Sequence, residues 1–138
     1  LLQILTLHDP QFERGIYVPA PVDVVLRENI TVQPDIVYLS RAKMDLIREG
    51  RVFGAPDLCI EVLSPSTSAY DLSRKRRYYQ GAGVREYWLV DPVENFIEVY
   101  RLQDGAFVRQ GVYGPDESFE SAALGGQTVS LKSLFDPQ

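Results

Sequence analysis

The stretch that decides the fold of this chain is Ala55-Pro56-Asp57-Leu58-Cys59-Ile60-Glu61-Val62-Leu63-Ser64-Pro65-Ser66-Thr67. It begins with turn residues, continues as an almost entirely apolar strand, and ends in residues that favour the start of a helix. One carboxylate, Glu61, interrupts the apolar strand. A buried carboxylate has to be paired, protonated or bound to a metal ion, because an isolated buried charge is costly. Glu61 is therefore the first candidate functional residue.

The composition is that of one ordinary globular domain. The chain has 138 residues, of which 45% are hydrophobic, so we expect a single domain over residues 1–138 that lacks its N-terminal segment. No apolar run reaches about 18 residues, so we expect no membrane span. The single cysteine, Cys59, favours a reducing, cytoplasmic setting. The net charge of −5 excludes polyanion binding by the whole surface but leaves room for a local basic patch.

Short apolar runs predict a sheet around the opening stretch. We expect the clearest strands at 15–19, 22–26, 36–39, 58–63 and 86–91. Asp104-Gly105, between apolar runs at 96–102 and 106–113, is a strong hairpin signal. Residues 119–124 and 128–135 read as further short strands or irregular segments, which makes the C-terminal part rich in β structure.

Two helices are expected between these strands. Ser40 is a plausible N-cap for a short helix over 41–49. The Ser and Thr residues at 64–68 precede a helix over 69–80 that ends at Gly81 or Gly83. This second helix crosses between strands 58–63 and 86–91, which makes those two strands parallel and adjacent. The pattern predicts a mixed α/β domain.

Two carboxylates are predicted to meet at the end of the central strands. If 36–39 and 58–63 pair antiparallel, Asp35 lies near Glu61, and such a pair can hold Mg²⁺. Asp57 is a weaker partner for Glu61, because four residues of strand at about 3.3 Å each separate the two by roughly 13 Å. Asp57 is equally explained as a turn or cap residue, so both aspartates stay open as ligands.

Lys75 is the candidate cation. It lies three residues after Leu72 and four before Tyr79, so it shares the apolar face of the predicted helix. There it can stabilise negative charge on a phosphate, with Asp71 to orient it. The alternatives are that Lys75 pairs with Asp71 or extends to the solvent. The run Ser-Arg-Lys-Arg-Arg at 73–77 is better explained as a solvated helix face than as a nucleic-acid patch.

The motif series Pro-Asp-Leu-Cys-Ile-Glu-Val-Leu-Ser-Pro-Ser-Thr (56–67), Asp71, Lys75, Tyr79 and Gly-Val-Arg-Glu-Tyr-Trp-Leu-Val-Asp-Pro (83–92) resembles the Uma2 family. That family is a group of unknown function described as restriction endonucleases, within the PD-(D/E)XK nuclease superfamily. The resemblance runs from about residue 20 to 101. It implies a restriction-endonuclease-like mixed β-sheet core flanked by helices, with a β-rich C-terminal extension.

The resemblance also implies a site. Members of the superfamily cleave phosphodiesters with Mg²⁺ or Mn²⁺ held by an Asp and a Glu, with a Lys nearby. Pro34-Asp35 best matches the Pro-Asp motif, with Pro56-Asp57 as a second contender, and Glu61-Val62-Leu63 matches the (D/E)XK element. Leu63 stands where the lysine is expected, so Lys75 on the helix becomes its counterpart.

The leading hypothesis is a metal-dependent endonuclease whose partner is nucleic acid, most simply DNA. Asp35 and Glu61 would bind the metal ion, Lys75 would stabilise the transition state, and Asp57 and Asp71 would support them. The second hypothesis is a nuclease-like fold without activity that serves as a binding module, with Glu61 and Lys75 as a buried ion pair. A third is a homodimer scaffold that uses the β-rich tail from Asn95 onwards, because exposed strand edges need covering.

Overall fold

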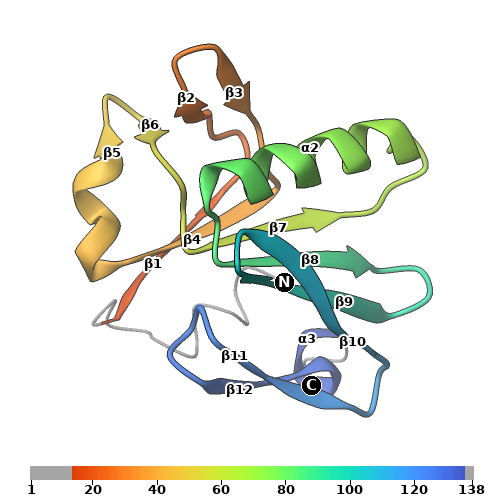
Figure 1. Cartoon of the computed structure of the whole chain (residues 1–138). Coiled ribbons are helices and arrows are strands. Elements are labelled where there is room, and N and C mark those ends of the chain that lie inside the picture. Colours follow the sequence, from red (N-terminus) through yellow and green to blue (C-terminus); the bar gives the residue numbers. More distant parts are fainter. Residues whose placement is uncertain (1–13, 136–138) are drawn as a thin grey trace.

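The computed structural model describes residues 14–135, and the first segment of the chain, including His8, lies outside the described part. A central sheet runs through the molecule, with a long helix on one face and a small β unit on the other (Figure 1). The six strands of the sheet lie in the order β1-β4-β7-β8-β9-β10. Their bounds are β1 Gly15–Pro19, β4 Ile36–Ser40, β7 Leu58–Val62, β8 Glu86–Asp91, β9 Phe96–Gln103 and β10 Ala106–Tyr113.

The middle of this sheet is mixed, as the sequence predicted. Strand β4 pairs antiparallel with β7, with Ile36 opposite Ile60. Strand β7 pairs parallel with β8, because the helix α2 (Ala69–Ala82) crosses between them. The parallel pairing was predicted and is confirmed, and the antiparallel pairing, which the sequence analysis only supposed, is also present.

Helix α2 has clear boundaries. The side chain of Ser68 accepts a hydrogen bond from the backbone N–H of Asp71, which caps the N-terminus. At the other end Gly83 has φ 88°, a left-handed conformation that glycine adopts without steric cost. Of the two glycines proposed as the end of the helix, Gly83 is the one that ends it.

The two faces of the sheet have separate cores because side chains alternate along each strand. Leu58, Ile60 and Trp88 point to the face covered by β11 (Ser118–Ser121), β12 (Gln127–Ser130) and the short helix α3 (Leu131–Phe135). Cys59, Tyr79 and Tyr87 lie in the other core, on the face covered by α2. Cys59 is fully buried as a free thiol, as expected for its place in the strand.

The prediction of a helix over 41–49 is wrong in its second half. A 3₁₀ helix covers only Arg41–Leu46, and Ile47–Arg48 forms strand β5, which pairs with β6 (Arg51–Phe53). The reason is the turn at Glu49 and Gly50, where both residues have positive φ (53° and 75°), as a two-residue hairpin requires. Strands β5 and β6 join β2 (Val24–Arg27) and β3 (Ile30–Val32) in a second sheet of order β3-β2-β6-β5.

The C-terminal part is rich in β structure, as expected. Asp104 and Gly105 form the turn of the β9–β10 hairpin, with φ of 54° and 81°. Residues 131–135, which the sequence left as strand or irregular, form α3 instead. Within residues 14–135 no helix is both long and apolar enough to cross a membrane.

Candidate active site

Asp35 and Glu61 lie on the same face of the sheet, at the end where β4 begins and β7 ends. The antiparallel register that sets Ile36 opposite Ile60 continues to bring Asp35 opposite Glu61. Glu61 is two residues from Cys59, so it points to the face that α2 covers. The Asp35 carboxylate turns toward β7, where its Oδ2 accepts a hydrogen bond from the backbone N–H of Val62 (2.6 Å). The predicted proximity of the two carboxylates is therefore present.

Lys75 reaches back from α2 to the sheet. Its Nζ lies 3.1 Å from Oε1 of Glu61 and donates a second hydrogen bond, of 3.0 Å, to the backbone carbonyl of Gln33. The side chain of Glu61 is 4% exposed and that of Lys75 is 24% exposed. The backbone N–H of Leu63, which follows the end of β7, donates to the backbone carbonyl of Val90.

Tyr79, one turn after Lys75, holds the other oxygen of Glu61. Its hydroxyl donates a hydrogen bond of 2.5 Å to Oε2, and its ring is fully buried. Burial raises the pKa of Glu61, because removal from water disfavours the charged form. The hydrogen bond from Tyr79 and the charge of Lys75 oppose this effect, while the charge of Asp35 adds to it. Two carboxylates and one ammonium group therefore share one corner of the molecule, and Glu61 is the most buried of the three.

An open pocket of about 280 Å³ lies at this corner. Asp35, Glu61 and Lys75 all line it, so the three predicted residues converge on one accessible space. The rest of the lining comes from the end of β7, the loop before α2 and the first turns of α2: Val62, Ser64, Thr67, Asp71, Leu72 and Arg74. The hydroxyl of Ser64 contacts those of Ser66 (3.1 Å) and Thr67 (2.9 Å), which holds this loop together.

The structure does not bring Asp57 to this pocket. Asp57 precedes the other end of β7 and is buried, and its Oδ2 accepts a hydrogen bond from the backbone N–H of Ser40 (2.7 Å). Its Oδ1 lies 3.9 Å from the Arg85 guanidinium. Among the roles left open by the sequence, this placement favours the structural one. As a metal ligand beside Glu61, Asp57 is disfavoured because a whole strand separates the two carboxylates.

Asp71 also differs from its expected role. It lines the pocket, but its carboxylate pairs with Arg74 at 3.6 Å, whereas Lys75 pairs with Glu61. Arg74, which was expected to be merely solvated, is exposed but also lines the pocket. The carboxylate of Asp71 therefore contacts Arg74, and the expected orientation of Lys75 by Asp71 is not what the structure shows.

The residues present are compatible with a magnesium ion. Within the described part of the chain no three His, Cys, Asp or Glu side chains gather as a ready metal cage. Mg²⁺, however, commonly binds one or two carboxylates and completes its shell with water and substrate phosphate. Asp35 and Glu61 supply two such carboxylates beside an open pocket. A cation beside Glu61 would favour the charged form of this carboxylate and so oppose the effect of its burial.

Sequence reasoning missed two supports of the site. The hydroxyl of Tyr79 was read only as part of an apolar helix face, although its spacing of four residues from Lys75 could have indicated a shared target. The carbonyl of Gln33 carries no signal in the sequence, because any residue has one.

Comparisons with known proteins agree with this fold. The Uma2 family model, described as "Putative restriction endonuclease", matches residues 1–132. A crystal structure of "a putative nuclease belonging to DUF820" from Anabaena variabilis is similar, with a TM-score of 0.77 and 21% sequence identity. The match covers 97% of this chain and 75% of that one. No curated protein matches this chain.

Proposed function

The chain belongs to the Uma2 family, and on that premise we propose that it is a Mg²⁺-dependent endonuclease that hydrolyses phosphodiester bonds in nucleic acid. The observation that carries this proposal is the convergence of Asp35, Glu61 and Lys75 on one open pocket. Two carboxylates beside a lysine form the donor set that phosphoryl chemistry needs: oxygen ligands for a hard cation and a fixed positive charge.

Asp35 and Glu61 would hold the metal ion. When bound, Mg²⁺ supplies charge neutralisation at the phosphate and lowers the pKa of a coordinated water. The chain prepares both carboxylates for this task. The Val62 N–H fixes Asp35 through Oδ2, and the Tyr79 hydroxyl fixes Glu61 through Oε2. Their rotamers are therefore set before any ligand arrives, which lowers the cost of assembling the site.

Lys75 would stabilise the charge that develops on the phosphate. An ammonium group has three N–H donors, and Glu61 Oε1 and Gln33 O accept two of them. The third can point to a phosphate oxygen in the pocket that Lys75 lines. A donor held in place by the protein needs no reorganisation during the reaction, which is why such groups contribute strongly to the rate.

The test of this proposal is cleavage of single- and double-stranded DNA and RNA with Mg²⁺ or with EDTA. Glu61→Gln should lower the Mg²⁺-dependent rate by about 100-fold or more, because it removes a metal-binding charge while keeping the shape. Glu94→Gln is the matched control, since Glu94 is exposed in the turn between β8 and β9. Undiminished cleavage by the Glu61→Gln variant would refute the assignment.

One observation favours the second candidate, a nuclease-like fold that binds partners without catalysis. Both oxygens of Glu61 already have protein donors, Lys75 and Tyr79, as in a satisfied buried ion pair. The two candidates differ in whether a divalent cation binds at Asp35 and Glu61. Homodimer formation through the β-rich tail stays a prediction.

A further inference from the structure

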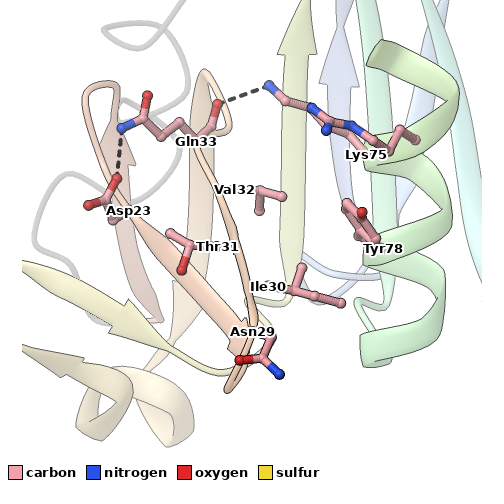
Figure 2. A pocket seen from close by; sticks show the side chains of 9 residues that line it. Asp23, Asn29, Ile30, Thr31, Val32, Gln33, Lys75 and Tyr78 are labelled. Atoms are coloured by element: carbon pink, nitrogen blue, oxygen red, sulfur yellow. Dashed lines mark hydrogen bonds between the residues drawn. The ribbon is translucent and has the colours of Figure 1, made fainter. Parts of the chain in front are cut away.

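A second and larger pocket adjoins the candidate active site. It has a volume of about 540 Å³ and lies between the β2–β3 hairpin and α2 (Figure 2). Residues Asn29 to Gln33 form the hairpin side, and Arg74, Lys75 and Tyr78 form the helix side. Arg74 and Lys75 line both pockets, so the two spaces meet at these side chains. We call this space the hairpin groove.

We propose that the hairpin groove binds one nucleotide of an unpaired strand, next to the phosphodiester held at Asp35 and Glu61. This inference rests on the proposed function for the identity of the ligand. A volume of about 540 Å³ lies within the range of pockets that enclose small molecules. A nucleic-acid strand that passes Lys75 in the candidate active site would continue into the hairpin groove, because the side chain of Lys75 lines both spaces.

Tyr78 supplies the stacking surface. It projects from α2 toward the hairpin, facing the region of Ile30 and Thr31 (Figure 2). Its ring is half-buried and packs against the core on the α2 side of the sheet, which fixes its orientation. Aromatic rings in such grooves stack on bases of any sequence. In a duplex the bases are already stacked on each other, so this contact selects an unpaired strand.

Arg74 supplies the phosphate contact. Its side chain is 45% exposed, and its pair with Asp71 is an exposed contact between residues three apart on the helix, at 3.6 Å. Such surface pairs contribute little to stability, so Arg74 can exchange Asp71 for a ligand at small cost. Guanidinium groups bind phosphate with two parallel hydrogen bonds, which suits a backbone phosphate beside the stacked base.

The hairpin wall of the groove is held in place by Gln33. Its side-chain amide donates to Oδ1 of Asp23 (2.7 Å), and its backbone carbonyl accepts from Lys75 (3.0 Å), as Figure 2 shows. Asp23 is the acidic residue in the lining of the groove, and the first of these hydrogen bonds occupies its Oδ1. Asn29 and Thr31 add uncharged donors and acceptors along the wall, which can bond to sugar or base edges.

The test is fluorescence anisotropy with a labelled single-stranded oligothymidine, in the Glu61→Gln background so that no cleavage occurs. Adding Tyr78→Ala should weaken binding by about 10-fold, while Tyr78→Phe should keep the affinity because the ring remains. Adding Arg74→Ala should weaken binding and lower the slope of log K against log salt by about one. Duplex DNA should show no dependence on Tyr78.

Matched controls come from the same helix. Tyr70 is 69% exposed and Arg77 is exposed, and neither lines the groove. Tyr70→Ala and Arg77→Ala should leave the affinity within about twofold of the background protein. Absence of binding, or equal affinities for Tyr78→Ala and Tyr70→Ala, would overturn the inference.

The two proposals fail separately. If the protein binds single strands through Tyr78 but the unsubstituted chain never cleaves, the groove stands and the endonuclease proposal falls. If it cleaves with Mg²⁺ but Tyr78→Ala alters neither binding nor cleavage of single strands, the groove is refuted and the endonuclease proposal stands.

Discussion

The Glu61 carboxylate is buried but not isolated. Lys75 neutralises one of its oxygens and Tyr79 donates to the other, yet burial still raises its pKa above the usual value. Ionisation of Glu61 in the folded state therefore comes at a cost to stability, which is common where a side chain serves function rather than folding. Under the proposed function, a metal ion bound beside Glu61 would offset this cost.

This cost predicts a pH dependence of stability. Because the pKa of Glu61 is raised in the folded state, its protonated form stabilises the fold below the pKa of an unfolded glutamate, about 4.3. The contribution is lost as pH rises through the raised pKa. We expect the free energy of unfolding of the unsubstituted protein to fall relative to that of Glu61→Gln as pH rises from about 4.3 through the raised pKa. EDTA is present so that no metal ion contributes. Urea titrations at successive pH values measure this difference in the free energy of unfolding. If the two proteins show the same dependence of stability on pH, the prediction is wrong.

At the level of secondary-structure elements, the sequence predicts the segments that position the site. The apolar runs predicted β4, β7 and β8, and the cluster of capping residues predicted α2. The parallel pairing of β7 with β8 followed from the helix that crosses between them. The antiparallel pairing of β4 with β7 places Asp35 beside Glu61. The helix predicted over 41–49 failed because a two-residue turn at Glu49-Gly50 overrides a short helical pattern.

Other parts of the site depend on tertiary contacts that no local pattern shows. The reach of Lys75 to Glu61 was expected, but the hydrogen bonds from Tyr79 to Glu61 and from Val62 to Asp35 require the packed positions of α2, β4 and β7. The hairpin groove was not predicted, because it is formed by two elements more than 40 residues apart that share no sequence signal.

A buried glutamate that sequence reasoning missed joins β8 to the C-terminal β unit. Glu86 is fully buried and accepts hydrogen bonds from Trp88, Ser121 and the backbone N–H of Ala122. Arg101 pairs with it at 3.4 Å. The β11–β12 unit is thereby attached to the central sheet on the face away from α2.

Replacing Glu86 should therefore destabilise the whole domain. Glu86→Ala leaves several buried donors without an acceptor, so we expect a loss of about 3 kcal/mol in the free energy of unfolding. Glu98→Ala is the matched control: Glu98 also lies on the sheet and pairs with an exposed arginine, Arg109, at 3.5 Å, and should cost far less. Denaturant titration compares them, and equal losses would show that the Glu86 contacts are not what joins the units.

At the scale of the whole molecule, the charge distribution is uneven. The chain carries a net charge of −5, yet four successive cations, Arg74 to Arg77, lie on α2. Two of them, Arg74 and Lys75, line both the candidate site and the hairpin groove. Under the proposed function, Arg74 and Lys75 would attract a polyanion to the two pockets, while the net negative charge disfavours polyanion binding over the whole surface.

The central claim is that Asp35 and Glu61 form one metal site, and calorimetric titration with Mn²⁺ or Mg²⁺ tests it most directly. The unsubstituted protein should bind one ion, and either Asp35→Asn or Glu61→Gln should remove the binding heat, while Asp57→Asn should retain it if folded. Binding should strengthen as pH rises, because protons compete for Glu61. An unsubstituted protein that gives no metal-dependent heat, or heat unchanged in both Asp35→Asn and Glu61→Gln, would contradict the account.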